Sequence, residues 1–221
     1  MRLFLATTSL EDIRWATDAG LIDGIVATPT IIAAESPQSD AREVLAEIAK
    51  ASRLPICASV AAVGANEIVK GAKELRKISE RIIVAIPFID DAIPAIRRLS
   101  ADGVSVAATL VYSAAQGILA AHAGASMVTV SVDALDTVGG DGNAVIADLR
   151  DAFDHSAAEC DVAAAGPSTA ASFAAAAGVG ANVAIVTPEV LRGLLQHPLT
   201  DRGLDRFLGA ISRRPKGKRG K

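Results

Sequence analysis

The chain has 221 residues, of which 51% are hydrophobic and 3% are aromatic, and it carries a net charge of −3. These values suit one large core of Ala, Val, Ile and Leu, so we expect a single domain over residues 1–212. No apolar run approaches the ~20 residues that cross a bilayer, and no secretory signal opens the chain, which argues against a membrane protein and favours the cytoplasm.

The charge is divided unevenly between the body and the C-terminal end. Residues 213–221 hold six of the 22 basic residues, which leaves 16 basic against 25 acidic residues in 1–212, a body at −9 with a +6 tail. We expect a disordered tail that aids solubility or contacts the acidic body, rather than one that binds nucleic acid. Cys57 and Cys160 have the spacing of neither a zinc site nor a redox motif, so we expect buried thiols, no metal and no cofactor.

Eight short runs rich in Ala and β-branched residues alternate along the chain with amphipathic segments. Each run has the length of a barrel strand. Helix N-cap patterns follow several of them, at Ser9, Ser113 and Thr187. The expected strands are Arg2–Thr7, Gly24–Thr28, Pro55–Val60, Arg81–Pro87, Val104–Thr109, Met127–Val132, Asp161–Ala165 and Asn182–Thr187.

Eight strand–helix units in one domain predict an α/β fold of the (β/α)8 TIM-barrel type. A doubly wound open sheet gives the same local alternation and is the alternative. Residues 201–211 repeat apolar side chains at helical spacing, so we expect an extra C-terminal helix that packs on its own barrel or on a neighbour.

In a barrel of this type, chemistry belongs at the carboxyl ends of the strands. Those ends carry hydroxyl groups, and we expect Thr28, Ser59, Thr109 and Ser131 to line a pocket that could bind a small polar or sugar-like molecule. A hydroxyl needs a partnered base to act as a nucleophile, and every lysine falls on an expected helix or in the tail.

Carboxylates are the titratable groups nearest the expected mouth. Asp133 and Asp136 follow the sixth strand with a spacing that could bring one of them over the pocket. Asp141 is also a candidate acid or base, although its place before a helix favours an N-cap.

Three segments resemble signatures of the transaldolase and fructose-6-phosphate aldolase family, most closely its short, single-domain members. They are Thr109-Leu-Val-Tyr-Ser-Ala-Ala-Gln116-Gly117, Ala27-Thr-Pro-Thr-Ile-Ile-Ala33 and Gly139-Gly-Asp-Gly142, and the resemblance runs from Met1 to about Phe207. It implies a class I aldolase ancestry, in which a lysine on the fourth strand forms a Schiff base with a ketose. It also implies a homo-oligomer, a pentamer or decamer assembled through the C-terminal helix.

Transferred to this sequence, the family's lysine falls on Ala85, and an alanine methyl group cannot form a carbinolamine. The other family positions that carry charge or polarity are also changed, whereas Thr109 is retained. The carboxylate of the first strand falls on Ala6, the loop asparagine on Thr28, the polar residue of the third strand on Ser59, that of the sixth on Ser131, the phosphate-binding arginine on Ala134 and the seventh-strand serine on Gly166.

This sequence lacks the nucleophile, the proton-transfer carboxylate and the phosphate-binding arginine of the family. Their combined loss removes the interactions that distinguish the transition state from the ground state. We therefore expect a family member without Schiff-base catalysis, either a pseudoenzyme or a small-metabolite-binding protein. The alternative is an enzyme of carbohydrate metabolism that acts on a sugar or carbonyl substrate by amine-free chemistry.

Overall fold

A computed structural model of the chain describes residues 1–212, and the predicted basic tail at 213–221 lies outside the described residues. Eight parallel strands form a closed barrel in the order β1 to β8, with β8 paired to β1. The closure confirms the (β/α)8 prediction and excludes the open-sheet alternative. Within residues 1–212, no helix is long and apolar enough to span a bilayer.

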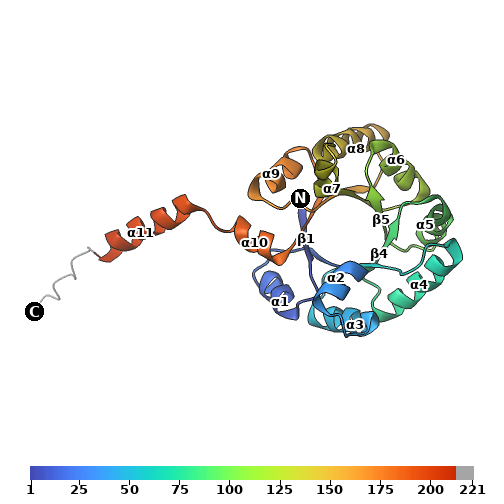
Figure 1. Cartoon of the computed structure of the whole chain (residues 1–221), viewed down its shortest axis with the longest axis horizontal. Helices are drawn as coiled ribbons and strands as arrows, with labels where there is room; N and C mark the ends of the chain where they lie inside the picture. Colours follow the sequence, from blue (N-terminus) through green and yellow to red (C-terminus); the bar gives the residue numbers. More distant parts are fainter. Residues whose placement is uncertain (213–221) are drawn as a thin grey trace, which may run out of the picture.

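The strands are β1 (Arg2–Ala6), β2 (Gly24–Ala27), β3 (Ile56–Ser59), β4 (Ile82–Pro87), β5 (Val106–Val111), β6 (Met127–Ser131), β7 (Asp161–Ala165) and β8 (Val183–Val186). The helices are α1 (Leu10–Asp18), α2 (Pro29–Glu35), α3 (Ala41–Ala51), α4 (Ala65–Ile78), α5 (Ile93–Ala101), α6 (Ala114–Ala123), α7 (Val132–Thr137), α8 (Gly142–Ser156), α9 (Ala170–Gly178), α10 (Pro188–Leu194) and α11 (Pro198–Ser212), with a short 3-10 turn, η1, at Asp90–Ala92. Figure 1 shows the larger helices as a ring around the barrel.

Seven of the eight predicted strands agree with the structure to within one residue at each end. The prediction for the fifth, Val104–Thr109, was wrong by two residues at both ends, because β5 continues past Thr109 through an irregularity in its pairing with β6. There Leu110 adopts a left-handed φ of 58° and is exposed, and Val111 returns to the core. Such a bulge depends on the neighbouring strand and has no simple local signal.

Two buried clusters lie on opposite sides of the strands. One fills the space between strands and helices and contains most of the Ile, Leu and Val side chains. The other fills the barrel and comes from alternate strand positions, namely Phe4, Val26, Cys57, Ala85, Ala107, Met127, Ala163, Val183 and Ile185. Because side chains alternate between the two faces of a strand, this second set identifies which strand residues point inward.

The predicted C-terminal helix is present as α11, which begins at Pro198, three residues before the expected start at 201. Figure 1 shows it standing away from the ring of helices. Its apolar side chains are largely exposed, including Leu204 at 52%, Phe207 at 61% and Ile211 at 51%. The preceding helix, α10, is docked on α1, where the Arg192 guanidinium lies 3.9 Å from the centre of the Trp15 ring and pairs with Asp12 at 2.7 Å.

Candidate ligand-binding site

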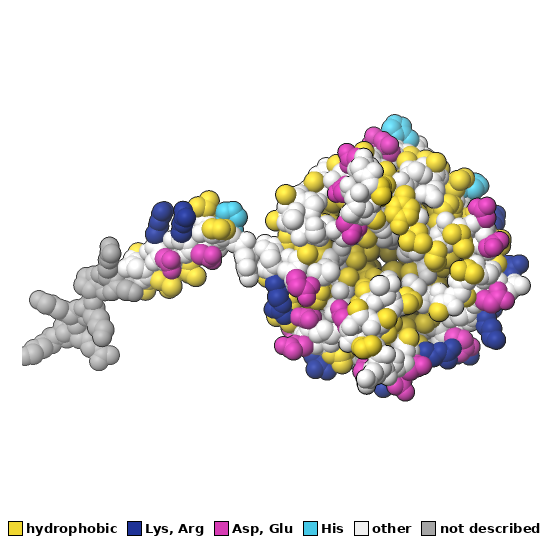
Figure 2. Space-filling model, in the orientation of Figure 1, with side chains coloured by type: hydrophobic (Ala, Val, Ile, Leu, Met, Phe, Trp, Pro, Cys, Tyr) yellow, Lys and Arg dark blue, Asp and Glu magenta, His cyan; other side chains and the backbone are white. Residues whose placement is uncertain are grey.

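The carboxyl ends of the eight strands form the mouth of the barrel, the place where barrels of this type hold their ligands. Figure 2 shows a hollow at the centre of the ring, with hydrophobic side chains around much of its edge. The short helices α2 and α7 follow β2 and β6 directly and lie beside this hollow. Ile31 of α2 packs on the inner cluster, so it covers part of the opening.

Ala85 belongs to the inner cluster of the barrel and is 1% exposed. Its neighbours across the sheet are Ser59 on β3 and Ala107 on β5. A side chain at this position therefore points into the barrel, below the mouth. Ala6 also packs on the inner cluster.

Four hydroxyl side chains face the barrel interior on the strands around Ala85. They are Ser59 on β3, Thr109 on β5, and Thr129 and Ser131 on β6. Their hydroxyl groups have no hydrogen-bond partner within residues 1–212. Thr129 is 7% exposed and lies on the same, inward-facing side of β6 as Met127. These hydroxyls are therefore available for hydrogen bonds with a polar ligand that enters the mouth.

Two other hydroxyls at the strand ends have local roles. The Thr28 side chain accepts a hydrogen bond from the Ile31 backbone at 3.4 Å and caps α2, and Thr187 caps α10 in the same way through Val190. Thr28, one of the four hydroxyls predicted to line the pocket, is therefore engaged in its own helix.

Glu35, at the end of α2, is held against the end of β1. One of its carboxylate oxygens, Oε2, accepts hydrogen bonds from the Thr7 hydroxyl at 2.9 Å, the Thr8 amide at 2.6 Å and the Thr8 hydroxyl at 2.9 Å. The three side chains border a recess of about 360 Å³ that Ser36 and Glu189 also line. Sequence reasoning missed Glu35, because the short helix that carries it lies inside a long connection.

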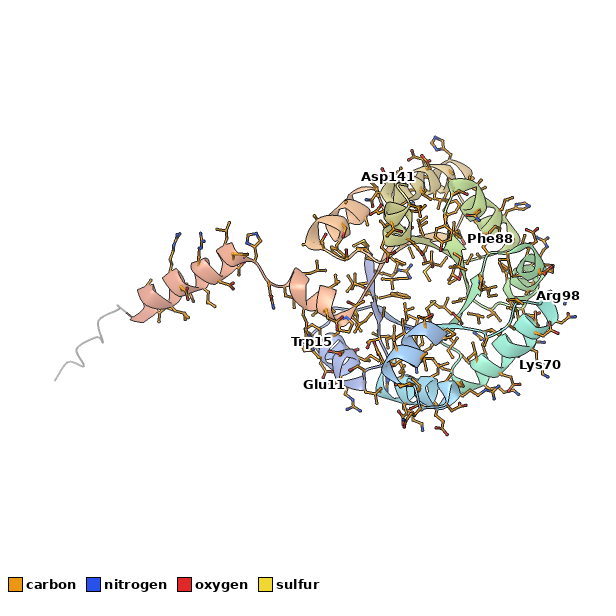
Figure 3. All side chains as sticks on the ribbon, viewed as in Figure 1. Glu11, Trp15, Lys70, Phe88, Arg98 and Asp141 are labelled. Atoms are coloured by element: carbon orange, nitrogen blue, oxygen red, sulfur yellow. The ribbon has the colours of Figure 1, made fainter. Side chains whose placement is uncertain are left out.

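The three carboxylates predicted as candidate acids or bases lie on the β6 side. Asp133 is exposed and accepts a hydrogen bond from the Ala134 amide at 2.8 Å. Its carboxylate also fills the space that a side chain at Gly166 would need, so it leans over the end of β7. Asp136 is exposed, and Asp141 caps α8 by accepting from the Ala144 amide at 3.0 Å. Figure 3 shows Asp141 at the α8 side of the ring.

The lysine and cysteine side chains of residues 1–212 lie outside the barrel mouth or stay protonated. Lysines 50, 70, 73 and 77 lie on α3 and α4. Burial raises the pKa of Cys57 to about 12, so this inward-facing thiol stays neutral. The pKa of Cys160 is raised to about 12 mainly by burial, and Asp161 adds to the shift. No cluster of three His, Cys, Asp or Glu side chains suited to a metal ion occurs in residues 1–212.

Comparison with known proteins identifies the family of this barrel. The family model described as transaldolase/fructose-6-phosphate aldolase matches residues 3–214. The chain belongs to this family. A probable transaldolase of Moorella thermoacetica is 40% identical over 208 residues, which cover 94% of this chain and 96% of that protein. A probable transaldolase of Heliobacterium modesticaldum is 39% identical with the same coverage.

A solved structure of 3-hexulose-6-phosphate synthase superposes with a TM-score of 0.65. It covers 88% of this chain and 98% of that one at 18% identity, a likeness that concerns the fold alone. The transaldolase/fructose-6-phosphate aldolase resemblance predicted from three motifs is thus confirmed along nearly the whole chain. The motif around Gln116 has a structural role here, since its side-chain oxygen accepts from the Tyr112 amide at 2.9 Å and Ser113 caps α6.

Proposed function

We propose that this member of the transaldolase/fructose-6-phosphate aldolase family has lost Schiff-base catalysis and binds a small polar, sugar-like molecule in the barrel mouth. The observation that carries the proposal is Ala85. The resemblance aligns it with the family's lysine, and its methyl group faces the barrel interior at 1% exposure. No lysine of residues 1–212 lies on a strand, so no described amine replaces it from within the barrel.

The binding part of the proposal rests on hydroxyl groups without partners. Ser59, Thr109, Thr129 and Ser131 offer both donors and acceptors on three strands, which suits a molecule with several hydroxyl or carbonyl groups. Their pKa values lie far above neutrality in the absence of a base, so they can hold a ligand but do not by themselves activate a nucleophile.

Asp133 supports a second candidate function, an enzyme that acts on a sugar or carbonyl substrate without an amine. Its carboxylate leans over the end of β7, where it could exchange a proton with a ligand in the mouth. Asp136 and Asp141 are weaker candidates, because Asp136 is exposed and Asp141 is engaged as a helix cap.

We also propose that the chain forms a homo-oligomer through α11. Support comes from the exposed apolar face of this helix, with Leu204, Phe207 and Ile211 at 52%, 61% and 51% exposure. An isolated helix of 15 residues is marginally stable in water, so this face needs a partner surface. Light scattering of the full chain should give an oligomer mass, and the Phe207→Asp variant should shift it toward the monomer.

Borohydride trapping tests the loss of Schiff-base chemistry. The protein is incubated with fructose 6-phosphate or dihydroxyacetone and reduced with borohydride, and its intact mass is then measured by mass spectrometry. A family member that has the lysine serves as the positive control. We expect an adduct on the control protein and none here. A stoichiometric adduct on a lysine of this chain would refute the proposal, and peptide mapping would identify the amine.

A further inference from the structure

Helix α6 covers the outside of the barrel without a charged side chain. Residues 103–132 contain no aspartate, glutamate, lysine or arginine, although 21% of the whole chain is charged. Burial explains this in β5 and β6, but not in α6, where Ile118 is 43% exposed and Leu119 is 57% exposed. Because a surface helix normally turns charged side chains to water, the apolar surface of α6 indicates a site of contact with another protein surface.

Four exposed side chains form one surface of this helix, which we call the α6 face. They are Ala115, Ile118, Leu119 and His122. Their spacing of three and four residues places them together, opposite the buried Gly117 and Ala120. Helix α9 is the other outer helix of residues 1–212 without a charged side chain, but the residues that it exposes are alanines and one glycine. The α6 face thus offers larger apolar side chains than α9 does.

The two edges of the α6 face differ in shape. Figure 1 shows α6 between α5 and α8 in the ring. On the α8 side, Ile118 and His122 of α6 line a recess of about 330 Å³ together with Phe153 and Ser156 of α8. Leu119 does not line this recess, because one step along a helix turns the side chain by about 100°. It lies on the opposite edge, toward α5, so the face has a projecting leucine on one edge and a hollow on the other.

Charges of opposite sign lie on the helices beside the α6 face. Ser100 of α5 faces the end of α6, because a Cβ atom at Gly124 would lie 2.6 Å from the Ser100 Oγ atom. Arg97 is exposed one turn before Ser100, on the same side of α5. On α8, Asp148 is exposed one turn before Ala152, which lines the recess. Neither Arg97 nor Asp148 has an ion pair within residues 1–212, so each charge is available to a partner.

The other charges on these two helices do not change this pattern. Arg98 donates to a side chain of α4 at 2.9 Å, on the side of α5 away from α6, and Figure 3 shows it at the outer edge of the ring. Arg150 of α8 pairs with Asp154 and donates to Asn182 before β8, so this pair faces away from α6. Asp151 adds a second exposed carboxylate to the outer surface of α8. The α6 face therefore has a basic side at α5 and an acidic side at α8.

A second copy of the chain is the partner that this arrangement fits. Two α6 faces can meet around a two-fold axis that runs either along α6 or across it. An axis along α6 sets α5 of each copy opposite α8 of the other. Arg97 and Asp148 both lie near the middle of their helices, so they then meet, and Leu119 meets the recess. An axis across α6 sets α5 opposite α5, which places like charges together and is disfavoured.

We propose that two copies of the chain pair through their α6 faces, with both barrels pointing in the same direction. Leu119 of each copy enters the recess between α6 and α8 of the other, and Arg97 of each copy pairs with Asp148 of the other. This contact is separate from the one proposed for α11, and neither contact depends on the other.

Sedimentation equilibrium of the full chain carrying Phe207→Asp tests the pairing, because this substitution removes the α11 contact and leaves α6 unchanged. We expect a dimer. Adding Leu119→Glu should give a monomer, and adding Ala115→Glu at the centre of the α6 face should do the same. Ala174→Glu makes the matched change on the exposed face of α9 and should leave the dimer intact. Far-UV circular dichroism checks that each variant is folded.

Charge reversal tests the direction of the pairing. In the Phe207→Asp chain, Arg97→Asp alone or Asp148→Arg alone should raise the dissociation constant of the dimer about tenfold, because each sets like charges opposite one another. Together they should bring it back to within about threefold of its starting value. Added salt should reduce the effect of each single change. Two losses that simply add would overturn the proposed arrangement.

The remaining outcomes also decide the matter. A Phe207→Asp chain that is monomeric, or a dimer that Leu119→Glu leaves intact, would overturn the proposal. Equal dissociation by Ala174→Glu would overturn it too, because the effect would then not be specific to α6. If Phe207→Asp keeps the mass of the native oligomer, the α11 proposal fails instead. Leu119→Glu in the native chain then decides the α6 pairing, which a lower mass supports and an unchanged mass refutes.

Discussion

Gly24→Ala should destabilise the barrel, because the added methyl group would collide with the ring that fills the barrel centre. A Cβ atom at Gly24 would lie 2.5, 2.6 and 2.7 Å from three ring carbons of Phe4. The ring is 1% exposed and is aligned with Ile185 across the β1–β8 pairing, so a shift of the ring would disturb its packing in the inner cluster. The φ angle of Gly24 is not positive, so the backbone itself accepts alanine.

The expected magnitude follows from two opposing effects. Replacing glycine by alanine at a compatible backbone position stabilises a protein by about 0.4–1 kcal/mol, whereas overpacking a filled core costs about 1–3 kcal/mol. We therefore expect a net loss of about 1–2 kcal/mol in the free energy of unfolding. Urea denaturation followed by far-UV circular dichroism measures it.

Phe4→Leu in the Gly24→Ala background should relieve the collision. The double mutant should be more stable than the sum of the two single losses predicts, by about 1 kcal/mol or more. Gly193→Ala is the matched control, since a Cβ there meets no atom within 4 Å, and it should not destabilise. A Gly24→Ala protein as stable as the native one, or two losses that simply add, would refute this packing of β1 against β2.

Three further predictions concern single side chains. Ala85→Lys should be destabilising near neutral pH, because burial lowers the pKa of the new amine. The loss of stability, measured by urea denaturation, should shrink as the pH rises toward about 10.4, the pKa of lysine in the unfolded chain. Ala101→Lys, at an exposed position at the end of α5, should show little pH effect in the same assay. Cys57 and Cys160 are buried, and their pKa values are raised to about 12. Near pH 8 they should react with a thiol reagent only when urea unfolds the protein. Fast labelling of the native protein would contradict their burial. The Arg81 guanidinium donates hydrogen bonds at 2.8–2.9 Å to two main-chain oxygens at the end of α3. Arg81→Met should therefore lower the free energy of unfolding, measured by calorimetry, by about 1–3 kcal/mol. An unchanged Tm would argue against these hydrogen bonds.

The fold was predictable from local pattern because each strand and helix has its own signal. Strand composition, the two-residue alternation and N-caps such as Ser9 and Ser113 recur through the chain, and the structure contains those caps. The bulge at Leu110 was not predictable, since its conformation depends on how β5 meets β6. The side chains of that segment alone do not specify which residue is left out of the hydrogen-bonded pairing between β5 and β6.

The site was predictable only in part, because strand ends are local features and convergence across the mouth is not. Ser59, Thr109 and Ser131 were selected by taking hydroxyls at the strand ends, and the structure places all three on inward-facing strand positions, while their role in binding stays a prediction. Thr129 was missed because it lies inside β6, although counting back two residues from Ser131 would have found it. Glu35 could not be found in this way, since its contact with β1 depends on the direction that α2 takes across the sheet.

The pairing of β8 with β1 has a consequence for the order of events during synthesis. Leu5 aligns with Val186, so the ring cannot close until nearly the whole described chain has left the ribosome. Until then β1 and the last completed strand each present an unpaired edge, a template for misassembly with other nascent chains. Ring closure with such distant contacts is intrinsically slow, and we expect a nascent chain that stalls before residue 183 to be a substrate for chaperones rather than a stable intermediate.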